Sequence, residues 1–359
     1  MSIDPESVRA PFAKWLSQRW PDVASLRVGA VQSPKSGFSA QTLILPVEGE
    51  RAGVPFSEKV VLRIESPEPA VYPQQAPGLD CEVEIQFRAM AAVAATGVVP
   101  LAPLIGFEGD ASVLGAPFFA MGFVEGEVPI ENPIYTAEGF FVDATPAERA
   151  RLVEEGLCAL AALHSLDWRA AGFGWLVPDG EEPTVERQVD IWERYARREL
   201  DGRAHPLIDR ALAWMRANRP APPHPPTLSW GDCRPGNVIW RDFRPLALTD
   251  FENVAVAPPE FDLGWWLMFD RWSHEAYGQP RLEGEPTRAE QVAIYERAAG
   301  RSMGDTFYYE LIGAFRYAAI VVRVSNRLVE RGLLPADQTL WLQNPASTCL
   351  EQMLDEVGA

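Results

Sequence analysis

The 359-residue sequence contains few lysines, histidines and cysteines. Of its 32 positively charged residues only three are Lys, so arginine supplies nearly all of the positive charge. The 50 Asp and Glu give a net charge of −18, which argues against nucleic acids and anionic membranes as partners, because phosphate binding requires clustered cations. The four cysteines form no CxxC pair and have no histidine at zinc-ligand spacing, which argues against a zinc site. Such isolated cysteines are typical of buried free thiols in a reducing cytosol.

Long hydrophobic runs are also missing. The most apolar stretch, residues 89–107, contains Gly97, Pro100 and Pro103 and is too interrupted to cross a bilayer. Residues 1–6 are polar and acidic and lack the basic and apolar segments of an export signal. Because the hydrophobic content of 47% is ordinary for a globular chain, we expect a soluble cytoplasmic protein with one large domain or two smaller ones.

The secondary-structure pattern changes near residue 125. A first helix is predicted after Asp4, and in residues 20–124 short β-rich runs bounded by Gly, Pro and Ser predict an antiparallel sheet with one inserted helix. The runs cover residues 26–31, 42–45, 59–65 and 118–124, and the helix covers residues 80–95. Beyond it, helical periodicity predicts helices over residues 146–164, 184–200, 206–218, 260–274, 287–299, 305–332 and 338–357. We therefore predict an α+β protein with a small β-rich lobe, residues 1–124, and a large α-rich lobe, residues 125–359.

Local signals mark two features of the large lobe. Thr145 and Glu148 have the spacing of a capping box at the start of the first long helix. Two short β runs within residues 237–249 predict a hairpin that turns at Arg244-Pro245.

The segment that follows residue 228 carries the strongest chemical signal. Asp232 follows an apolar strand, Asn237 comes five residues later, and Asp250 ends the next predicted hairpin. Each residue alone would be an ordinary turn residue, but the joint D-x4-N and D-F-E spacing is typical of a Mg–nucleotide phosphotransferase. In such enzymes one Asp orients the substrate hydroxyl and accepts its proton, while the Asn and the second Asp bind the metal. We therefore interpret Asp232 as the catalytic base and Asn237 and Asp250 as metal ligands.

Five segments of the chain, including the two just described, carry motifs in a fixed order. They are Ser36–Thr42, Phe119–Gly126, Ala162–Asp167, Trp230–Asn237 and Asp250–Glu252. Together they resemble the aminoglycoside phosphotransferase family, whose H-G-D-x4-N loop is written here as W-G-D-C-R-P-G-N. More closely the chain is similar to the branch that includes the kinase-like domains of acyl-CoA dehydrogenase fusions. The resemblance extends from about residue 25 to 330 and implies a protein-kinase-like, two-lobed fold.

The resemblance implies roles for several residues of the large lobe. Asp232 would be the catalytic Asp, and Arg234 lies where kinase catalytic loops often carry a cation near the transferred phosphate. Asp262 would support the loop by accepting backbone N–H bonds, and it could also cap the helix that follows. Trp230 stands where the family has His, and a Trp can fill the same space with one hydrogen-bond donor.

The resemblance also implies a loop that covers the phosphates and a hinge that binds adenine. The loop comprises Ser36, Gly37, Phe38 and Ser39. It offers backbone N–H groups and a Ser hydroxyl, and it lacks the G-x4-G-K-[ST] pattern of a Walker loop. The hinge would bind the adenine edge through the backbone between Met121 and Phe123.

A strand cation is the last part that a kinase-like site requires. In the strand of residues 59–65, Lys59 and Arg63 point to the same face, and the family branch places its cation at the position of Arg63. We therefore expect Arg63 to bind the α- and β-phosphates, with Glu84 of the inserted helix as its partner and Glu82 as the alternative.

The predicted activity is ATP- and Mg²⁺-dependent transfer of the γ-phosphoryl group to a hydroxyl of a small molecule. The family name implies an aminoglycoside-like acceptor, whereas the acyl-CoA dehydrogenase fusions imply a hydroxyacyl-CoA or another metabolic alcohol. Residues 125–359 carry 23 Lys and Arg against 37 Asp and Glu, and the resulting net charge of −14 agrees with a cationic acceptor. Trp230, together with Ala40 at a position where the branch has Asn, leaves a nucleotide-binding pseudokinase as an alternative of another class.

Two further interpretations are less favoured. His164 and Asp167 could form a catalytic dyad, but the matching family motif is a structural helix end. The sequence contains no G-x-S-x-G elbow, which argues against an α/β-hydrolase. We expect the acceptor pocket to involve residues 125–145 and the helices after residue 184.

Overall fold

A computed structural model describes residues 3–33, 39–220 and 224–359. The chain divides into two compact units: unit 1 is Met1–Ala70 with Gly78–Glu125, and unit 2 is Val71–Pro77 with Gly126–Ala359. Segment 71–77 lies in the stretch that the sequence assigned to the small lobe, but it packs with unit 2. Within the described ranges, no helix combines the length and the apolar character that a membrane crossing requires.

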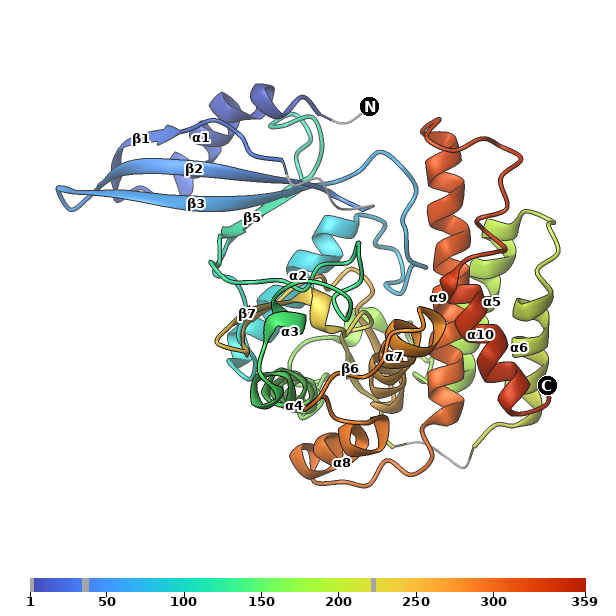
Figure 1. The fold of residues 1–359 in the computed structure, drawn as a ribbon. Coiled ribbons are helices and arrows are strands. Elements are labelled where there is room, and N and C mark those ends of the chain that lie inside the picture. Colours follow the sequence, from blue (N-terminus) through green and yellow to red (C-terminus); the bar gives the residue numbers. More distant parts are fainter. Residues whose placement is uncertain (1–2, 34–38, 221–223) are drawn as a thin grey trace. The chain divides into compact units, whose positions relative to one another are not determined.

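Unit 1 contains a five-stranded antiparallel sheet with the strand order β1-β2-β3-β5-β4 (Figure 1). The strands are β1 (Val23–Val28), β2 (Gln41–Arg51), β3 (Val54–Ile64), β4 (Leu104–Glu108) and β5 (Phe118–Gly122). Alternate residues Val60, Leu62 and Ile64 of β3 are buried in the core. Because successive side chains of a strand point to opposite faces, Arg63 lies on the face away from this core.

Three helical segments accompany the sheet of unit 1. A 3₁₀ turn, η1 (Pro5–Val8), leads into α1 (Arg9–Arg19), which packs on the core through Phe12 and Leu16. Helix α2 (Glu82–Thr96) matches the predicted inserted helix and contacts β4 and β5. Its Phe87 ring lies 5.9 Å from the ring centroids of both Phe107 and Phe119.

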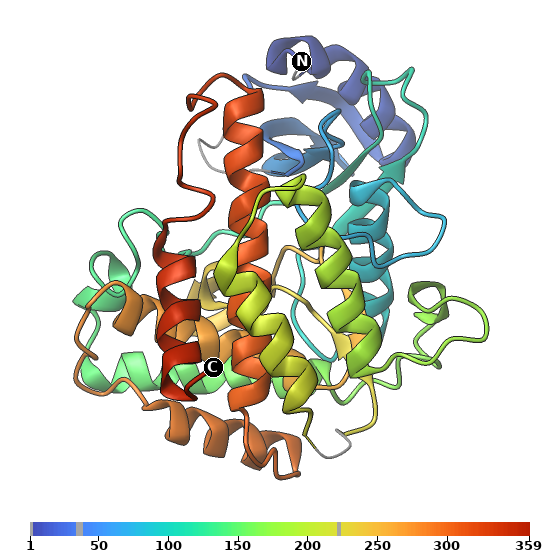
Figure 2. The same cartoon turned by 90° about the vertical axis from the view of Figure 1, so that its right-hand side faces the viewer.

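Unit 2 is mainly helical. Its longer helices are α4 (Pro146–Leu163), α5 (Val185–Leu200), α6 (Pro206–Ala217), α7 (Glu260–Arg271), α8 (Arg288–Ala299), α9 (Phe307–Glu330) and α10 (Pro345–Glu356). Helix α9 lies beside α5, α6 and α10 (Figure 2). It also packs closely on α7, because a side chain at Gly264 would come within 2.5 Å of the Tyr309 backbone. The predicted capping box of Thr145 and Glu148 is confirmed at the start of α4.

Two small strand pairs frame the loops of unit 2. Strand β6 (Thr227–Ser229) pairs with β9 (Ala255–Ala257), and β7 (Val238–Arg241) pairs with β8 (Arg244–Leu248). The prediction that the hairpin turns at Arg244-Pro245 is wrong, since the turn is at Asp242-Phe243. These two residues have φ angles of +53° and +60°, which suit the two-residue turn that matches the twist of a hairpin.

Two helix predictions need correction at their ends. The helix expected to run to residue 274 is α-helical only as far as Arg271. A π-helical turn, η4 (Trp272–Ala276), follows it directly. The helix expected from residue 338 starts only at Pro345, because Asn344 accepts the backbone N–H of Ser347 as an N-cap at 2.9 Å. The four cysteines are free as predicted, but only Cys233 and Cys349 are buried, since Cys81 is half-buried and Cys158 is exposed.

Candidate active site

Asp232 lies at the centre of a buried hydrogen-bond network in unit 2. It follows β6 and is only 3% exposed. Its Oδ2 accepts hydrogen bonds from Asn237 Nδ2 at 2.7 Å and from the Tyr72 hydroxyl at 3.0 Å. Its Oδ1 accepts from Trp265 Nε1 at 2.9 Å, and Arg234 Nε lies 3.3 and 3.4 Å from the two oxygens. Such donors offset the cost of burying a charge, and they fix the orientation of the carboxylate.

Asn237 ends the short 3₁₀ turn Pro235–Asn237 and binds the catalytic loop through its amide nitrogen. Nδ2 donates to the Asp232 backbone carbonyl at 2.8 Å as well as to its carboxylate. The amide oxygen Oδ1 accepts no hydrogen bond from the described residues. The backbone N–H and the hydroxyl of Thr249 both donate to the Asn237 carbonyl at 2.9 Å, so the loop is tied to the residue before Asp250.

Asp250 has a φ angle of +59°, a left-handed conformation that non-glycine residues adopt mainly at strained or functional positions. Electrostatics link it to the Asp232 network through Tyr72. Burial raises the pKa of the Tyr72 hydroxyl well above its ordinary value, and the charges of Asp232, Asp250 and Glu252 raise it further. Asp250 directly follows Thr249, which is bonded to the Asn237 carbonyl, so the structure brings the predicted trio into one region, and their carboxylates and amide oxygen are the ligand types that Mg²⁺ prefers.

Asp262 holds the loop before Asp232. Its carboxylate accepts the backbone N–H groups of Trp230 at 2.7 Å and Gly231 at 3.0 Å, together with the Ser229 hydroxyl at 2.7 Å. Burial alone would raise the pKa of Asp262, but hydrogen bonds from His164, Ser229 and Gly231 hold it below its ordinary value. The residue lies inside the first turn of α7 and is not its N-cap.

His164 and Asp167 do not form a dyad. The His164 ring contacts the Tyr295 hydroxyl at 2.6 Å and the Asp262 carboxylate at 3.0 Å. Asp167 accepts backbone N–H groups from Arg169 and Ala170. His164 therefore supports Asp262, in line with the structural role expected for it.

Gly231 allows the backbone to pass through a crowded point. Its φ angle is +85°, and a Cβ there would lie 1.9 Å from the Asn253 carbonyl oxygen. Its own carbonyl accepts hydrogen bonds from Arg316 at 2.7 Å and from Asn253 at 3.1 Å. Only glycine fits between Trp230 and Asp232 in this arrangement.

Trp230 replaces the family His and still links the loop to its surroundings. Its indole N–H donates to the Thr249 carbonyl at 2.9 Å, and its ring stacks on Phe251 with centroids 5.8 Å apart. The side chain is 1% exposed. The substitution therefore replaces an imidazole by a buried ring whose single donor is used.

Arg234 bridges two carboxylates in this structure. It contacts Asp232 and forms an ion pair with Glu131, and its guanidinium lies 5.5 Å from the Phe269 ring centroid. Burial lowers the pKa of Arg234, but the charges of Asp232 and Glu131 outweigh this effect and raise it, so the group stays charged. Glu131 was not predicted as a site residue.

Tyr72 is the main site residue that the sequence did not indicate. It lies on segment 71–77, which α5 holds at two points. Tyr195 donates its hydroxyl to the Val71 carbonyl, and the side chains of Gln75 and Gln188 exchange hydrogen bonds of 3.2 and 3.4 Å. Because Tyr72 and Asp232 are 160 residues apart in sequence, no local pattern predicts their contact.

In unit 1, Arg63 groups with the end of the predicted phosphate loop. Its guanidinium donates to the hydroxyls of Thr42 at 2.9 Å and Ser39 at 3.5 Å. Lys59, the other candidate on this strand, pairs with Glu125 at 3.1 Å. Ser36, Gly37 and Phe38 of the predicted loop lie outside the described residues.

The predicted pair of Arg63 and Glu84 is not formed in this structure. Glu84 instead lies 3.8 Å from Arg88, one turn further along α2. The carboxylate that reaches α2 from the strand end is Glu65, which accepts the backbone N–H groups of the first two helix residues at 3.2 and 2.9 Å. Glu65 therefore stabilises the helix N-terminus.

The predicted hinge continues the sheet of unit 1. Met121 pairs with Val61 and Leu104 across the neighbouring strands and is half-buried. The Phe123 N–H donates to the Lys59 carbonyl at 3.0 Å.

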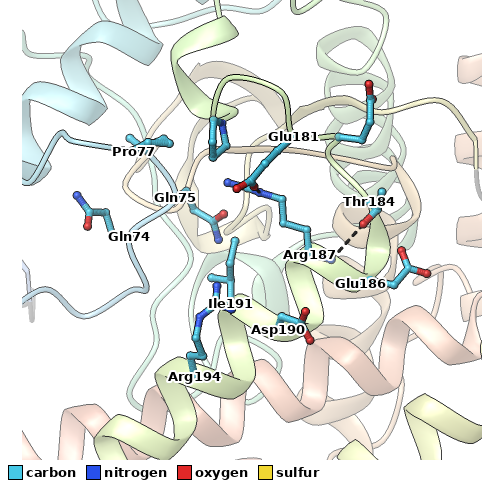
Figure 3. A pocket seen from close by; sticks show the side chains of 13 residues that line it. Gln74, Gln75, Pro77, Glu181, Thr184, Glu186, Arg187, Asp190, Ile191 and Arg194 are labelled. Atoms are coloured by element: carbon cyan, nitrogen blue, oxygen red, sulfur yellow. Dashed lines mark hydrogen bonds and ion pairs between the residues drawn. The ribbon is translucent and has the colours of Figure 1, made fainter.

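A pocket of about 560 Å³ opens beside α5 (Figure 3). Segment 71–77, the loop before α5 and the first turns of α5 line it. Its charged lining residues are Glu181, Glu182, Glu186, Asp190, Arg187 and Arg194. None of the predicted site residues lines this pocket, and its lining residues do not include any hydrogen-bond partner of Asp232.

A family model described as "Phosphotransferase enzyme family" matches residues 33–301. The curated relatives include acyl-CoA dehydrogenase family member 11 of Pongo abelii, which is 25% identical over 261 residues, covering 68% of this chain and 31% of the relative. The protein of the same name in Gallus gallus is 28% identical over 235 residues, covering 62% and 28%. The chain thus spans about a third of the length of these relatives.

Solved structures share the fold. A protein of Ralstonia eutropha assigned by name to the aminoglycoside phosphotransferases aligns with a TM-score of 0.68 at 23% identity, covering 99% of both chains. Wild-type aminoglycoside 2'-phosphotransferase-IIIa in its GDP complex aligns with a TM-score of 0.57 at 15% identity, covering 96% of this chain and 98% of the other. These likenesses confirm the predicted α+β, protein-kinase-like fold. With the family match over most of the described chain, they confirm the resemblance that the motifs carried: the chain belongs to the phosphotransferase enzyme family.

Proposed function

We propose that the protein catalyses ATP- and Mg²⁺-dependent transfer of the γ-phosphoryl group to a hydroxyl of a small molecule. The observation that carries the proposal is the buried Asp232 carboxylate, held by Asn237, Trp265 and Tyr72 on a loop that Asp262 supports. A fixed carboxylate of this kind can orient a hydroxyl and accept its proton during transfer.

The proposed reaction is a single displacement at the γ-phosphorus. The acceptor oxygen forms a bond to phosphorus as the bond to the β–γ bridging oxygen breaks. Asp232 takes the hydroxyl proton, and the products are ADP and a phosphate monoester. Arg234 would stabilise negative charge on the transferred group while it keeps its ion pair with Glu131.

Asn237 and Asp250 are the proposed metal ligands. The amide oxygen of Asn237 has no hydrogen-bond donor among the described residues, and Asp250 directly follows Thr249, whose hydroxyl is bonded to the Asn237 carbonyl. Bound Mg²⁺ would neutralise charge on the nucleotide phosphates.

Unit 1 is proposed to supply the nucleotide contacts. Arg63 would bind the α- and β-phosphates, and its contact with Ser39 supports a link to the loop of residues 36–39. The backbone between Met121 and Phe123 would bind adenine. Because Glu84 pairs with Arg88, no role in orienting Arg63 is proposed for it.

The test is Mg-ATP turnover against a panel of alcohols with the wild-type protein and Asp232→Asn. We expect the variant to bind ATP but to lose about 10²- to 10⁴-fold in acceptor-dependent ADP release, the usual contribution of a general base. Asp242→Asn, a change at an exposed carboxylate of the β7–β8 turn, is the matched control and should leave turnover unchanged. ATP binding without acceptor-dependent ADP release from any alcohol class would instead support the pseudokinase alternative.

A further inference from the structure

Five aromatic side chains of unit 2 form a series of contacting rings that begins at Asp232 and ends at an exposed tyrosine. They are Trp265, Phe269, Trp272, Tyr277 and Tyr317, and we call this set the aromatic wall. Trp265 is fully buried, and Tyr277 is 42% exposed. Phe269, Trp272 and Tyr317 are half-buried. The wall therefore reaches from the proposed catalytic base to the surface of the unit.

The rings of the aromatic wall are in contact throughout. Trp265 donates its indole N–H to Asp232 at 2.9 Å, and its ring centroid lies 5.1 Å from that of Phe269. Phe269 lies 5.4 Å from Trp272, which lies 4.9 Å from Tyr277. Tyr317 packs against the middle of this series, 4.9 Å from Phe269 and 5.3 Å from Trp272.

Tyr317 provides a polar group at the inner end of the wall. Its hydroxyl makes no hydrogen bond with the described residues. Burial raises its pKa, so the hydroxyl stays protonated, and the Tyr317 ring centroid lies 6.2 Å from that of Trp265, which donates to Asp232. A ligand on the wall would thus meet an unused hydroxyl beside the proposed catalytic base.

The charges beside the wall do not favour a cation. Arg234 lies over Phe269 at 5.5 Å, so a positive guanidinium already faces this ring. Glu131 pairs with Arg234, and Glu275 of the π-helical turn pairs with Arg271 at 3.0 Å and Arg288 at 2.6 Å. A polycationic sugar needs uncompensated carboxylates, and Arg234 over Phe269 would repel a quaternary ammonium from the part of the wall next to Asp232.

We infer that the acceptor is an alcohol with an uncharged, apolar body that lies on the aromatic wall while its hydroxyl reaches Asp232. The inference rests on the proposed function, and it names the substrate class of that site. It is carried by the continuity of the rings with Asp232, by the exposure of the outer rings, and by the compensated carboxylates beside them. Apolar ligand surface stacked on these rings would supply binding energy through burial.

A homologous series of linear alcohols from butanol to octanol tests the inference by calorimetric binding, independently of turnover. Because each buried methylene contributes about 0.8 kcal/mol, we expect the dissociation constant to fall about fourfold per added carbon. Kanamycin and choline, as polycationic and quaternary-ammonium probes, should bind more weakly than octanol. Tighter binding of either probe, or an affinity independent of chain length, would overturn the inference.

Variants locate the binding on the wall. Trp272→Ala and the exposed Tyr277→Ala should each weaken octanol binding about five- to tenfold, because a lost aromatic contact costs about 0.5–1.5 kcal/mol beyond its buried area. Trp214→Ala is the matched control, since Trp214 is also half-buried among aromatic rings of unit 2 but lies on α6. Unchanged octanol binding by both wall variants would overturn the inference. Wall-dependent binding without any ADP release would support the apolar site while contradicting the proposed function.

Discussion

Tyr72 makes the same contact with Asp232 that an acceptor hydroxyl would make in the proposed reaction. Its hydroxyl donates to Oδ2 at 3.0 Å, and the same oxygen also accepts a hydrogen bond from Asn237. Tyr72→Phe would remove this donor and keep the ring. Because the acceptor hydroxyl would compete with Tyr72 for Oδ2, removing the Tyr72 donor should tighten acceptor binding. A hydrogen bond to a charged group contributes about 1.5–3 kcal/mol, so we expect the KM of the acceptor to fall about tenfold in steady-state kinetics at saturating ATP.

Tyr195→Phe is the control for this prediction. It removes a phenol hydroxyl that holds the same segment through Val71 but does not touch Asp232. A decrease in kcat at constant KM in Tyr72→Phe would contradict competition, and it would mean that Tyr72 positions the carboxylate for catalysis.

At the residue scale, sequence spacing predicted the trio but not its surroundings. Asp232, Asn237 and Asp250 lie in one short segment that a single strand pair folds back on itself, so their proximity follows from local geometry. The contact from Tyr72 depends on a distant segment that joins unit 2. Glu84 was expected to pair with Arg63, whereas in this structure it lies 3.8 Å from Arg88 on its own helix, a choice of partner that helical periodicity does not predict.

At the scale of elements, periodicity predicted most long helices, but it did not predict the short strand β4 and it misplaced one turn. Strand β4 was missed because its five residues, Leu104–Glu108, have no alternating pattern and are all half-buried. The β7–β8 turn was placed too late because Pro245 is a strong turn signal, while the residues that turn are Asp242 and Phe243. In both cases the structure follows from hydrogen bonding to a partner strand, β4 with β5 and β7 with β8, and not from the local sequence.

The π-helical turn after α7 presents His274 to a buried charge network. The ring contacts the Gln279 carbonyl at 3.2 Å through Nδ1 and Glu285 at 2.8 Å through Nε2. Since a carbonyl and a carboxylate only accept, both ring nitrogens donate and the ring is charged. Asp270, His274 and Glu285 have metal-ligand spacing within 4.8 Å, but Arg281 contacts both oxygens of Asp270, so the cluster is an ion-pair network.

This network predicts a pH dependence of stability. Burial lowers the pKa of His274, but the hydrogen bond and charge of Glu285 and the charge of Asp270 outweigh it, so the pKa lies above the ordinary 6.5 despite the opposing Arg281. The stabilisation is therefore complete below pH 6.5 and lost as pH rises through the raised pKa. Urea unfolding of wild type and His274→Gln should show a stability difference that shrinks as pH increases.

His205 serves as a control because its contribution to stability should depend on pH in the opposite direction. Burial lowers its pKa, so its contribution to stability is lost as pH falls below 6.5. A difference between wild type and His274→Gln that is constant with pH would contradict the charged ring. A rise in the unfolding midpoint of wild type with added zinc would contradict the ion-pair assignment.

At the scale of the whole molecule, net charge says little about the acceptor. Some acids of unit 2 are paired inside the unit, such as Asp270 with Arg281 at 2.6 Å and Glu199 with Arg323 at 3.8 Å, and the net charge does not say where the unpaired acids lie. The acidic pocket beside α5 shares no residue with the aromatic wall. The net charge of −14 in residues 125–359 therefore does not translate into a cationic site at Asp232.

Ionic strength separates the two sources of acceptor binding. Raising salt from about 0.1 M to about 1 M shortens the Debye length from about 10 Å to about 3 Å and screens long-range attraction between an acidic surface and a cation. Burial of an uncharged alcohol on the aromatic wall does not depend on that attraction. We therefore expect the KM of the acceptor, measured at saturating Mg-ATP, to change less than about twofold over this range. A tenfold rise would mean that the acidic excess of the molecule, and not the rings beside Asp232, attracts the acceptor.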